Sequence, residues 1–267
     1  MPWIPRGLRE GIVTSIYPGR PDGYGVGFRG AVVVDPEQHD TDPGLQSAID
    51  ACPTEAISVA NAGPRLDRGR CILCGRCTQL APETFRFDPT FETSSIDRHH
   101  LVVPEAAEDD LGLETLRSEL ARRVRALRRS VHVRHVDAGS DGADEWEVAA
   151  LTNPIYDVQR LGIFFTASPK HADVLLVTGV GSAGMLGPLR HTFEVMPDPK
   201  VVVAAGVDAI SGGLLGVGYA SRGGIGDAVP VDVFVPGAPP TPFGLLHGIL
   251  MAVGLLPTAV RGGSQRE

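Results

Sequence analysis

All four cysteines of this 267-residue chain lie between residues 52 and 77. Three form the run Cys71-Ile-Leu-Cys74-Gly-Arg-Cys77, and the fourth precedes a proline in Cys52-Pro53. We expect no secretory signal, because the first residues lead to arginines at positions 6 and 9 without an apolar segment. In such a chain, cysteines more often bind metals or act in catalysis than form disulfides. The spacing therefore predicts a fold that brings a tight triplet and one remote cysteine to a common metal centre.

This spacing is typical of an iron–sulfur cluster. Bacterial ferredoxins with two clusters use the run C-x2-C-x2-C-x3-C-P, and the last cysteine of each run ligates the cluster of the other run. Here the second run keeps its triplet but ends in Ala81-Pro82, whereas the first run keeps only Cys52-Pro53. The lost triplet positions hold Asp42, Leu45 and Ala48. One site has kept all its ligands and the other has lost them, which predicts a single [4Fe–4S] cluster on the four cysteines.

A structural zinc site is the alternative, because four thiolates also suit Zn²⁺. Zinc sites usually pair two C-x2-C knuckles, however, whereas a triplet with a remote Cys-Pro is the cluster pattern. Gly75, between two ligands, would let the backbone approach the cluster so that N–H groups point at sulfur. Arg70 and Arg76 are interpreted as surface charges. Short strands expected at residues 31–35, 56–60 and 85–88 complete a small α+β, ferredoxin-like unit.

A chain of this length predicts two domains, since one domain typically takes roughly 100–200 residues. Residues 106–130 are expected to form a helix, with Asp109 near its start and Arg129 near its end. Beyond it, apolar runs alternate with helical segments, which predicts an α/β domain with a parallel, flavodoxin-like sheet. Strands are expected at residues 131–136, 172–177, 200–205 and 231–235, and helices at 153–161, 185–196 and 242–255. The predicted division is a ferredoxin-like domain (1–105), a linker helix (106–130) and the α/β domain (131–267).

Composition argues against two classes of partner. The net charge is −8, whereas phosphate binding needs a basic face, so no nucleic-acid partner is expected. The longest apolar stretch, residues 243–256, contains His247 and three glycines. It is shorter than the roughly 20 residues that a membrane-spanning helix needs, so no direct membrane span is expected.

The loops after the predicted strands carry a family resemblance. Two characteristic stretches are Ala149-Ala-Leu-Thr-Asn-Pro-Ile-Tyr-Asp157 and Pro230-Val-Asp-Val-Phe-Val-Pro-Gly-Ala-Pro-Pro240. With residues 160–163, 167–179 and 209–213, they resemble the small, cluster-bearing subunit shared by respiratory complex I (its B-type subunit) and the group 4 [NiFe] hydrogenases of the formate hydrogenlyase type. The N-terminal half, including the lead-in Arg6-Gly-Leu-Arg-Glu-Gly-Ile-Val-Thr14, resembles the two-cluster ferredoxin subunit of the same complexes. The chain is thus similar to a fusion of two subunits.

The resemblance implies a non-catalytic electron-transfer or accessory subunit of a membrane-associated oxidoreductase complex. Its partners would be a large hydrogenase-like or complex-I-like subunit and membrane subunits, which would hold it peripherally on the cytoplasmic, inner face of the membrane. In the relatives, loops of the second domain supply four cysteines to a [4Fe–4S] cluster. The corresponding positions here are Asp141, Asp144, Asp208 and Ala238. Three carboxylates and a methyl group do not replace four thiolates around soft iron, so this domain is expected to be a scaffold without its cluster.

The sequence leaves three alternatives: a cation site on the aspartates, a purely structural cluster and a dinucleotide site. We expect the three aspartates to be separately solvated or salt-bridged rather than to bind Mg²⁺ or Ca²⁺, since three oxygen ligands make a weak site. The remaining cluster could serve only to stabilise a structural subunit. Gly179-Val-Gly-Ser-Ala-Gly184 matches the dinucleotide fingerprint G-x-G-x-x-G, with Asp208 as the ribose-binding acid, but Pro188 interrupts the following helix. Histidines are not expected to pair as ligands, because His132 and His135 lie on opposite faces of one strand.

Overall fold

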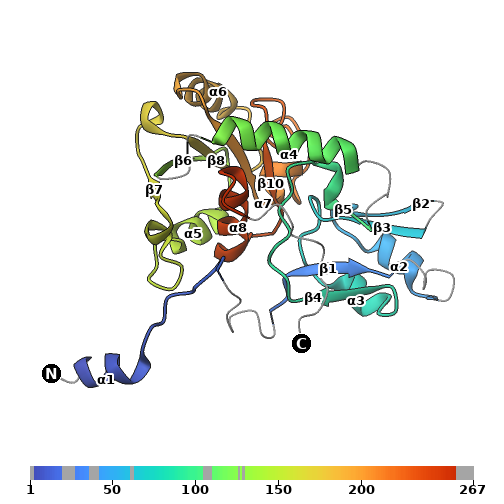
Figure 1. Cartoon of the computed structure of the whole chain (residues 1–267). Helices are drawn as coiled ribbons and strands as arrows, with labels where there is room; N and C mark the ends of the chain where they lie inside the picture. Colours follow the sequence, from blue (N-terminus) through green and yellow to red (C-terminus); the bar gives the residue numbers. More distant parts are fainter. Residues whose placement is uncertain are drawn as a thin grey trace.

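The computed structural model describes residues 3–19, 28–35, 42–60, 63–104, 110–125, 127 and 130–256. In these residues a small part with two antiparallel sheets lies beside a larger α/β part, as Figure 1 shows. The smaller part holds the cysteines, and the larger part holds the loops with the aspartates.

The larger sheet is parallel throughout, with the order β10-β9-β8-β6-β7. Its strands are β6 (Val131–Asp137), β7 (Ile163–Phe165), β8 (Val174–Thr178), β9 (Val201–Ala205) and β10 (Val233–Val235). The central strands β8 and β9 are buried along their whole length, as their continuous apolar runs predict. The strand order reverses between β6 and β8. In open α/β sheets, ligands bind at such a switch point, beside the carboxyl ends of the strands.

Helices cover both faces of this sheet. They are α4 (Asp110–Val124), α5 (Ala143–Ala150), α6 (Leu186–Val195), α7 (Gly206–Ser211) and α8 (Pro242–Ala252). One face packs against α4, α5 and the almost wholly buried α8, and the other packs against α6 and α7. Alternate residues of each strand point to the two faces, so that Leu176 joins the first core and Leu175 the second. The predicted parallel α/β domain is therefore confirmed.

The N-terminal part is built from short elements. They are α1 (Trp3–Glu10), β1 (Ala31–Val34), α2 (Leu45–Asp50), β2 (Ile57–Ala60), β3 (Gly63–Asp67), α3 (Arg76–Leu80), β4 (Phe85–Asp88), η3 (His99–Leu101) and β5 (Val102–Val103). One antiparallel sheet pairs β1 with β4, and the other has the order β2-β3-β5. The three strands expected here are present, whereas β3 and β5 were not predicted.

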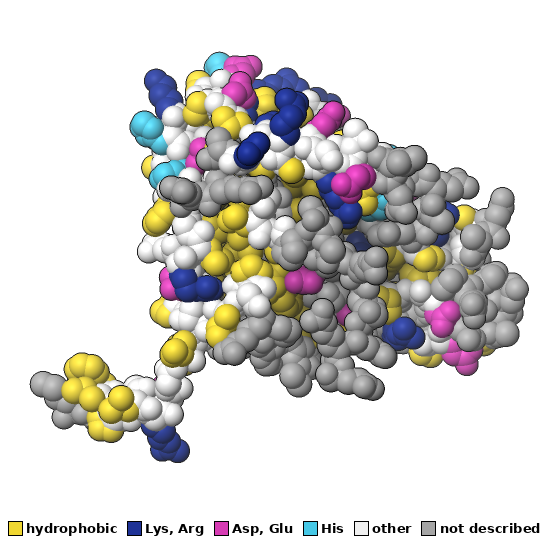
Figure 2. All heavy atoms as spheres, viewed as in Figure 1, with side chains coloured by type: hydrophobic (Ala, Val, Ile, Leu, Met, Phe, Trp, Pro, Cys, Tyr) yellow, Lys and Arg dark blue, Asp and Glu magenta, His cyan; other side chains and the backbone are white. Residues whose placement is uncertain are grey.

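Helix α1 extends away from the rest of the molecule and buries none of its residues (Figure 1). Trp3, Ile4 and Leu8 are exposed, and Figure 2 shows hydrophobic side chains and arginines on different sides of the helix. Among the described residues, no helix combines the length and apolar character needed to cross a membrane.

Two helix predictions need correction. Residues 153–161 form turns and the short 3₁₀ helix η4 (Val158–Leu161) instead of an α-helix. Pro154 has no N–H to donate, and Asp157 adopts a left-handed backbone with φ 43°. Helix α5 is not among the expected helices; its first turn carries Asp144 and Glu145, where acidic side chains favour a helix. Within the described residues the expected 106–130 helix is present as Asp110–Val124, and Asp109 and Arg129 lie outside those residues.

The two parts are joined by segments from the N-terminal half. Ser95 exchanges two backbone hydrogen bonds with Phe234 of β10, at 3.0 and 2.8 Å. Aromatic rings of Tyr17 and Phe91 pack on Phe243 of α8, with the Phe91 and Phe243 rings stacked at 5.0 Å between centroids. The described chain therefore has continuous packing between the cysteine-bearing part and the parallel sheet.

We expect Phe243→Ala to lower the free energy of unfolding by about 3 kcal/mol, as for other buried phenylalanines. Phe243 is only 7% exposed and contacts rings from both halves of the chain. Chemical denaturation would measure the change, with Phe164→Ala as the control because Phe164 is 39% exposed. Equal effects of the two substitutions would contradict this account of the junction.

Candidate metal centre and carboxylate site

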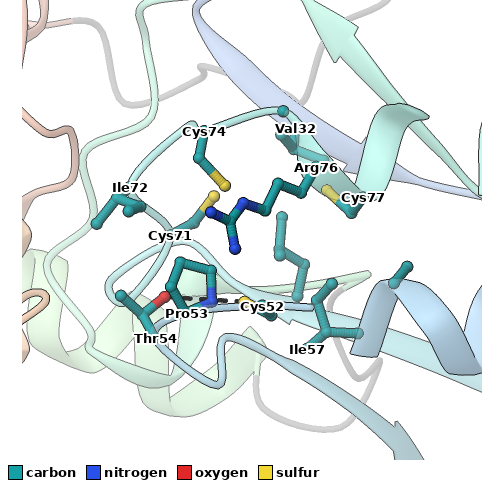
Figure 3. Close-up of a pocket in the computed structure, with 13 residues that line it drawn as sticks. Val32, Cys52, Pro53, Thr54, Ile57, Cys71, Ile72, Cys74, Arg76 and Cys77 are labelled. Atoms are coloured by element: carbon teal, nitrogen blue, oxygen red, sulfur yellow. Dashed lines mark hydrogen bonds between the residues drawn. The ribbon is translucent and has the colours of Figure 1, made fainter. Parts of the chain in front are cut away.

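The four cysteines line one pocket in the N-terminal part, as Figure 3 shows. Cys52 follows α2, Cys71 and Cys74 lie in the loop between β3 and α3, and Cys77 lies in α3. The wall of the pocket is largely apolar and includes Val32, Ala48, Ile57 and Leu66. Within the described ranges, no three His, Cys, Asp or Glu side chains are grouped so that they could hold one metal ion.

The loops that carry the cysteines contain left-handed backbone conformations. Glu55 and Leu73 have φ values of 50° and 55°, which are uncommon for residues with a side chain, and Gly75 has φ 74°. The turn at Glu55 directs the Ala56 N–H to Cys52 Sγ, at 3.3 Å between nitrogen and sulfur. Hydrogen bonding by the Leu73 backbone lowers the pKa of Cys71. Such N–H···S bonds stabilise thiolate ligands, and local backbone strain of this kind gathers at functional sites.

Two of the thiols, those of Cys71 and Cys77, resist ionisation. Burial raises the pKa of Cys71 to about 12, and the neighbouring cysteines add to this rise. Burial likewise raises the pKa of Cys77 to about 11, with a further contribution from Cys74. Four thiolates in one apolar pocket therefore require positive charge, which the irons of a cluster supply. The four thiol donors and their shared pocket have the chemistry that a [4Fe–4S] cluster requires, although the side chains are not drawn together as closely as in a metal site.

Arg76 lies across this pocket instead of extending freely from the surface. Its guanidinium donates to the Ala51 carbonyl at 3.4 Å and, in Figure 3, lies between Cys52 and the pair Cys71 and Cys74. The side chain is nevertheless exposed, so its charge is well screened by solvent.

The positions at which a second ferredoxin cluster would have its cysteine ligands hold residues that pack or form hydrogen bonds within the protein. Ala48 and Ala81 have no exposed surface and pack in the same core as Phe85. The buried Asp42 accepts hydrogen bonds from the Thr84 N–H and hydroxyl, at 3.1 and 3.0 Å. This region is therefore held by side-chain packing and hydrogen bonds.

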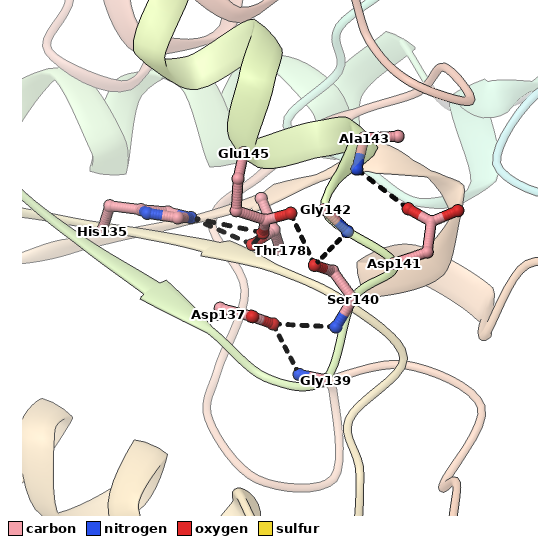
Figure 4. Close-up of polar contacts among 9 residues, drawn as sticks. All are labelled: His135, Asp137, Gly139, Ser140, Asp141, Gly142, Ala143, Glu145 and Thr178. Atoms are coloured by element: carbon pink, nitrogen blue, oxygen red, sulfur yellow. Dashed lines mark hydrogen bonds and ion pairs between the residues drawn. The ribbon is translucent and has the colours of Figure 1, made fainter.

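A second polar site lies at the carboxyl ends of β6 and β8 (Figure 4). Glu145 of α5 accepts a hydrogen bond from Thr178, whose hydroxyl lies 3.0 Å from His135 Nε2. Ser140 donates to the other oxygen of Glu145. The sequence analysis did not identify this site, which is formed by Glu145, Thr178 and His135. These residues are far apart in the sequence and meet only in the folded chain, so no sequence spacing indicates them.

The four positions that the resemblance assigns to a lost cluster have different environments. Asp141 is exposed and accepts from the Ala143 N–H at 2.9 Å, and Ala238 is also exposed. Asp208 is partly buried in the first turn of α7. Asp144 is only 5% exposed, and its carboxylate lies against Gly206, where a methyl group would come within 2.5 Å of Oδ2.

The expectation that these aspartates are separately solvated or salt-bridged is wrong for Asp144. Burial raises its pKa to about 8, and the charges of Asp208, Glu145 and Asp141 add to the rise. Burial also raises the pKa of Asp208, with contributions from Asp141 and Glu145. The reason is that α5 begins at Ala143, which turns Asp144 inward towards α7.

The glycine-rich turn after β8 packs against the chain itself. A methyl group on Gly179 would come within 2.6 Å of the Gly139 backbone, and one on Gly181 within 2.1 Å of the Gly224 carbonyl oxygen. The Val180 N–H donates to Gly139, and its carbonyl accepts from Gly224. Close backbone approach thus explains these two glycines without a bound pyrophosphate.

Comparison with known proteins identifies the second half of the chain. Residues 142–252 match the family described as NADH ubiquinone oxidoreductase, 20 Kd subunit. Formate hydrogenlyase subunit 7 of Escherichia coli (strain K12) is 40% identical over 143 residues, 54% of this chain and 56% of that protein. The chain therefore spans little more than half the length of this relative.

Two further relatives agree with that match. The probable membrane-bound hydrogenase subunit mbhJ of Pyrococcus furiosus is 36% identical over 147 residues, 55% of this chain and 88% of that protein. The B-type subunit of the NADH-quinone oxidoreductase of Citrifermentans bemidjiense is 45% identical over 104 residues, 39% of this chain and 61% of that protein. The chain belongs to the NADH ubiquinone oxidoreductase 20 Kd subunit family.

Proposed function

We propose that the chain is an iron–sulfur electron-transfer or accessory subunit of a membrane-associated, complex-I-like or group 4 hydrogenase-related complex. The observation that carries this proposal is the single pocket lined by Cys52, Cys71, Cys74 and Cys77. These residues would hold one [4Fe–4S] cluster, which exchanges one electron at a time. Relatives named as subunits of formate hydrogenlyase, a membrane-bound hydrogenase and NADH-quinone oxidoreductase support the assignment to an oxidoreductase complex.

The proposed organisation is a fusion of a ferredoxin-like domain (1–105) and the family domain (131–267), joined by residues 106–130. The family domain serves as a scaffold, with Asp141, Asp144, Asp208 and Ala238 at the positions of a lost cluster. Helix α4 supports its joining role, because Leu120 and Val124 pack in the core of the sheet and Arg123 pairs with Asp232 beside β10.

The cysteine pocket adjoins the scaffold. Cys71 also lines a second pocket, shared with Pro236 and Gly237 of the loop after β10. The Gly237 carbonyl in turn accepts a hydrogen bond from Val207 of α7 at 2.9 Å. A partner that docks on this edge of the sheet would thus lie close to the redox centre.

Exposed apolar groups supply surfaces for partner subunits. Between α7 and β10, Leu215, Val217 and Tyr219 are 74%, 81% and 100% exposed. Helix α1 offers a second apolar surface (Figure 2). We propose that a large complex-I-like or hydrogenase-like subunit and membrane subunits cover these surfaces and hold the chain at the membrane. Soluble monomeric proteins rarely expose large apolar patches, so such surfaces favour contact with a partner.

Iron and acid-labile sulfide analysis of the purified chain tests the cluster. We expect about four irons and about four sulfides per chain, as in one [4Fe–4S] cluster. Cys71→Ser should lose most of both, whereas Arg70→Ala, the neighbouring exposed residue, should keep them. Stoichiometric zinc without sulfide, or twice the iron, would contradict the proposal.

A structural subunit is the second candidate, and the N-terminal core favours it. Cys77 is buried in this core, and Cys52 and Cys71 pack against it. A cluster on these residues would stabilise the fold whether or not it transfers electrons. We expect no NAD(P)H binding, because the glycine-rich turn is occupied by neighbouring backbone.

A further inference from the structure

Asp144 is a buried acid that has no hydrogen-bonding partner among the residues that the structure describes. Its side chain is 5% exposed, and it makes no hydrogen bond or ion pair with any residue in the described ranges. A buried carboxylate normally requires several hydrogen bonds or an opposite charge, because transfer of an isolated charge from water is costly. The environment of Asp144 therefore requires a positively charged ligand or the neutral form of the acid.

Two helix starts bring the carboxyl groups together. Asp144 lies in the first turn of α5, which follows β6, and Asp208 lies in the first turn of α7, which follows β9. The Asp144 carboxylate contacts the Gly206 position, two residues before Asp208. The Asp208 carboxylate lies against Gly213, where a methyl group would overlap its Oδ1. Both acids thus occupy the carboxyl edge of the sheet, where this class of fold binds ligands.

The charged groups that act on Asp144 are all acidic. They are Asp208, Glu145, Asp141 and Asp137, each of which raises the pKa of Asp144. Of these, Glu145 and Asp137 are engaged by the hydrogen bonds of the loop after β6 (Figure 4). Asp208 has no such partner in the described chain, and Asp141 caps its own loop. Among these acids, Asp144 and Asp208 are therefore the two whose carboxylates no hydrogen bond engages within the described residues.

We propose that Asp144 and Asp208 form a proton-binding pair that holds one shared proton at neutral pH. Two like charges close together in a buried site cannot both ionise, so one carboxylate takes up a proton and becomes a carboxylic acid. The raised pKa of Asp144, about 8, agrees with this geometry. Binding involves no electron, and the site does not depend on the cysteines or on the proposed cluster.

A proton fits this pair better than a divalent cation. Ca²⁺ takes about six to eight oxygen ligands and Mg²⁺ about six in a regular octahedron. The pair offers two carboxylates, and the remaining acids of the cluster are exposed or engaged by hydrogen bonds. A shared proton needs only the two carboxyl groups themselves.

Infrared spectroscopy of the full chain, with ¹³C-labelled aspartate, tests the proposal directly. At pH 7 we expect the carbonyl band of one protonated, labelled carboxyl group, which disappears as the pH rises through about 8. Asp144→Asn should remove the band, whereas Asp141→Asn should retain it at pH 7, because Asp141 is exposed. Absence of the band in the unmodified chain, or its persistence in Asp144→Asn, would overturn the proposal.

A second variant tests the pairing and guards against a folding defect. Asp208→Asn keeps Asp144 but removes the neighbouring charge, so the band should titrate at a pH lower by about one unit. An unchanged midpoint would overturn the pairing. Thermal stabilisation by magnesium or calcium chloride, lost in Asp144→Asn, would assign the site to a cation instead. None of these measurements depends on the iron–sulfur cluster. A contrary result would therefore overturn the proton-binding pair and leave the proposed function untouched.

The same pair predicts how stability depends on pH. The folded state keeps a proton that the unfolded chain releases near the ordinary pKa of 3.8. Stability from this site is thus complete below that pH and is lost as the pH rises through about 8. Asp144→Asn should flatten this decline and raise the melting temperature at pH 9 above that of the unmodified chain. A steeper decline in the variant would overturn the proposal.

Discussion

Gly181→Ala is expected to lower the free energy of unfolding by roughly 4 kcal/mol or more, placing it among the most damaging single substitutions. Gly181 has φ 68°, and an alanine methyl group would lie 2.1 Å from the Gly224 carbonyl oxygen. Both strands of backbone at this contact are buried or hydrogen-bonded, so neither can move without losing contacts. Chemical denaturation followed by circular dichroism would measure the loss.

Gly184→Ala is the matched control, because it changes another glycine of the same fingerprint. A methyl group there has no neighbour within 4 Å, and the residue is exposed. We expect its effect on the free energy of unfolding to stay within about 0.5 kcal/mol. A dinucleotide site would instead tie both glycines to ligand binding, and NAD(P)H would then stabilise the unmodified chain. Comparable loss from both substitutions would contradict the packing explanation.

The sequence predicted those parts of the fold whose signal is local. The apolar runs of β8 and β9 are fully buried in the centre of a parallel sheet, and only such strands lack a polar face. The spacing of Cys71, Cys74 and Cys77 predicts one metal centre; in the structure they line one pocket with Cys52, and the centre itself stays a prediction. The apolar runs and the cysteine spacing are both patterns of residues that lie close together in the sequence, so they can be recognised without knowledge of tertiary contacts.

The missed elements depend on tertiary contacts. Strand β5 has two residues and exists only through its pairing with β3, and β7 is a three-residue edge strand. Asp144 could not be recognised as buried, because its burial comes from α7, more than sixty residues further along the chain. An aspartate at a helix start is usually solvated, so local propensity favoured the wrong environment.

The two sites are linked through the loop after β10. Cys71 shares a pocket with Gly237, whose carbonyl binds the Val207 N–H in the helix turn that also carries Asp208. An electron added at the cysteine centre would place negative charge on one side of this loop, and the carboxyl pair lies on the other. If both proposals hold, the loop after β10 would lie between a one-electron centre and a proton-binding pair.

Loss of the proposed cluster is expected to unfold the N-terminal part while the parallel sheet persists. Three of the four cysteines belong to or pack on the N-terminal core, whereas the sheet has two cores of its own. In Cys77→Ser, amide protection in residues 45–88 should fall at least about a thousandfold, or about 4 kcal/mol. Protection in β8 and β9 should change little. Hydrogen exchange with mass spectrometry would measure both regions, with Arg70→Ala as the control.

Unfolding of the Cys77→Ser variant does not by itself distinguish a cluster that carries electrons from one that is purely structural. Redox measurements on the unmodified chain are needed as well. A structural cluster accounts for the unfolding, because ligand binding to the folded state stabilises it. An electron carrier must also be reduced and reoxidised without loss of protein structure. We therefore expect a reversible EPR signal from the unmodified chain under titration with dithionite, with N-terminal protection unchanged between the two redox states. A cluster that is reduced only with loss of this protection would assign it to structure alone.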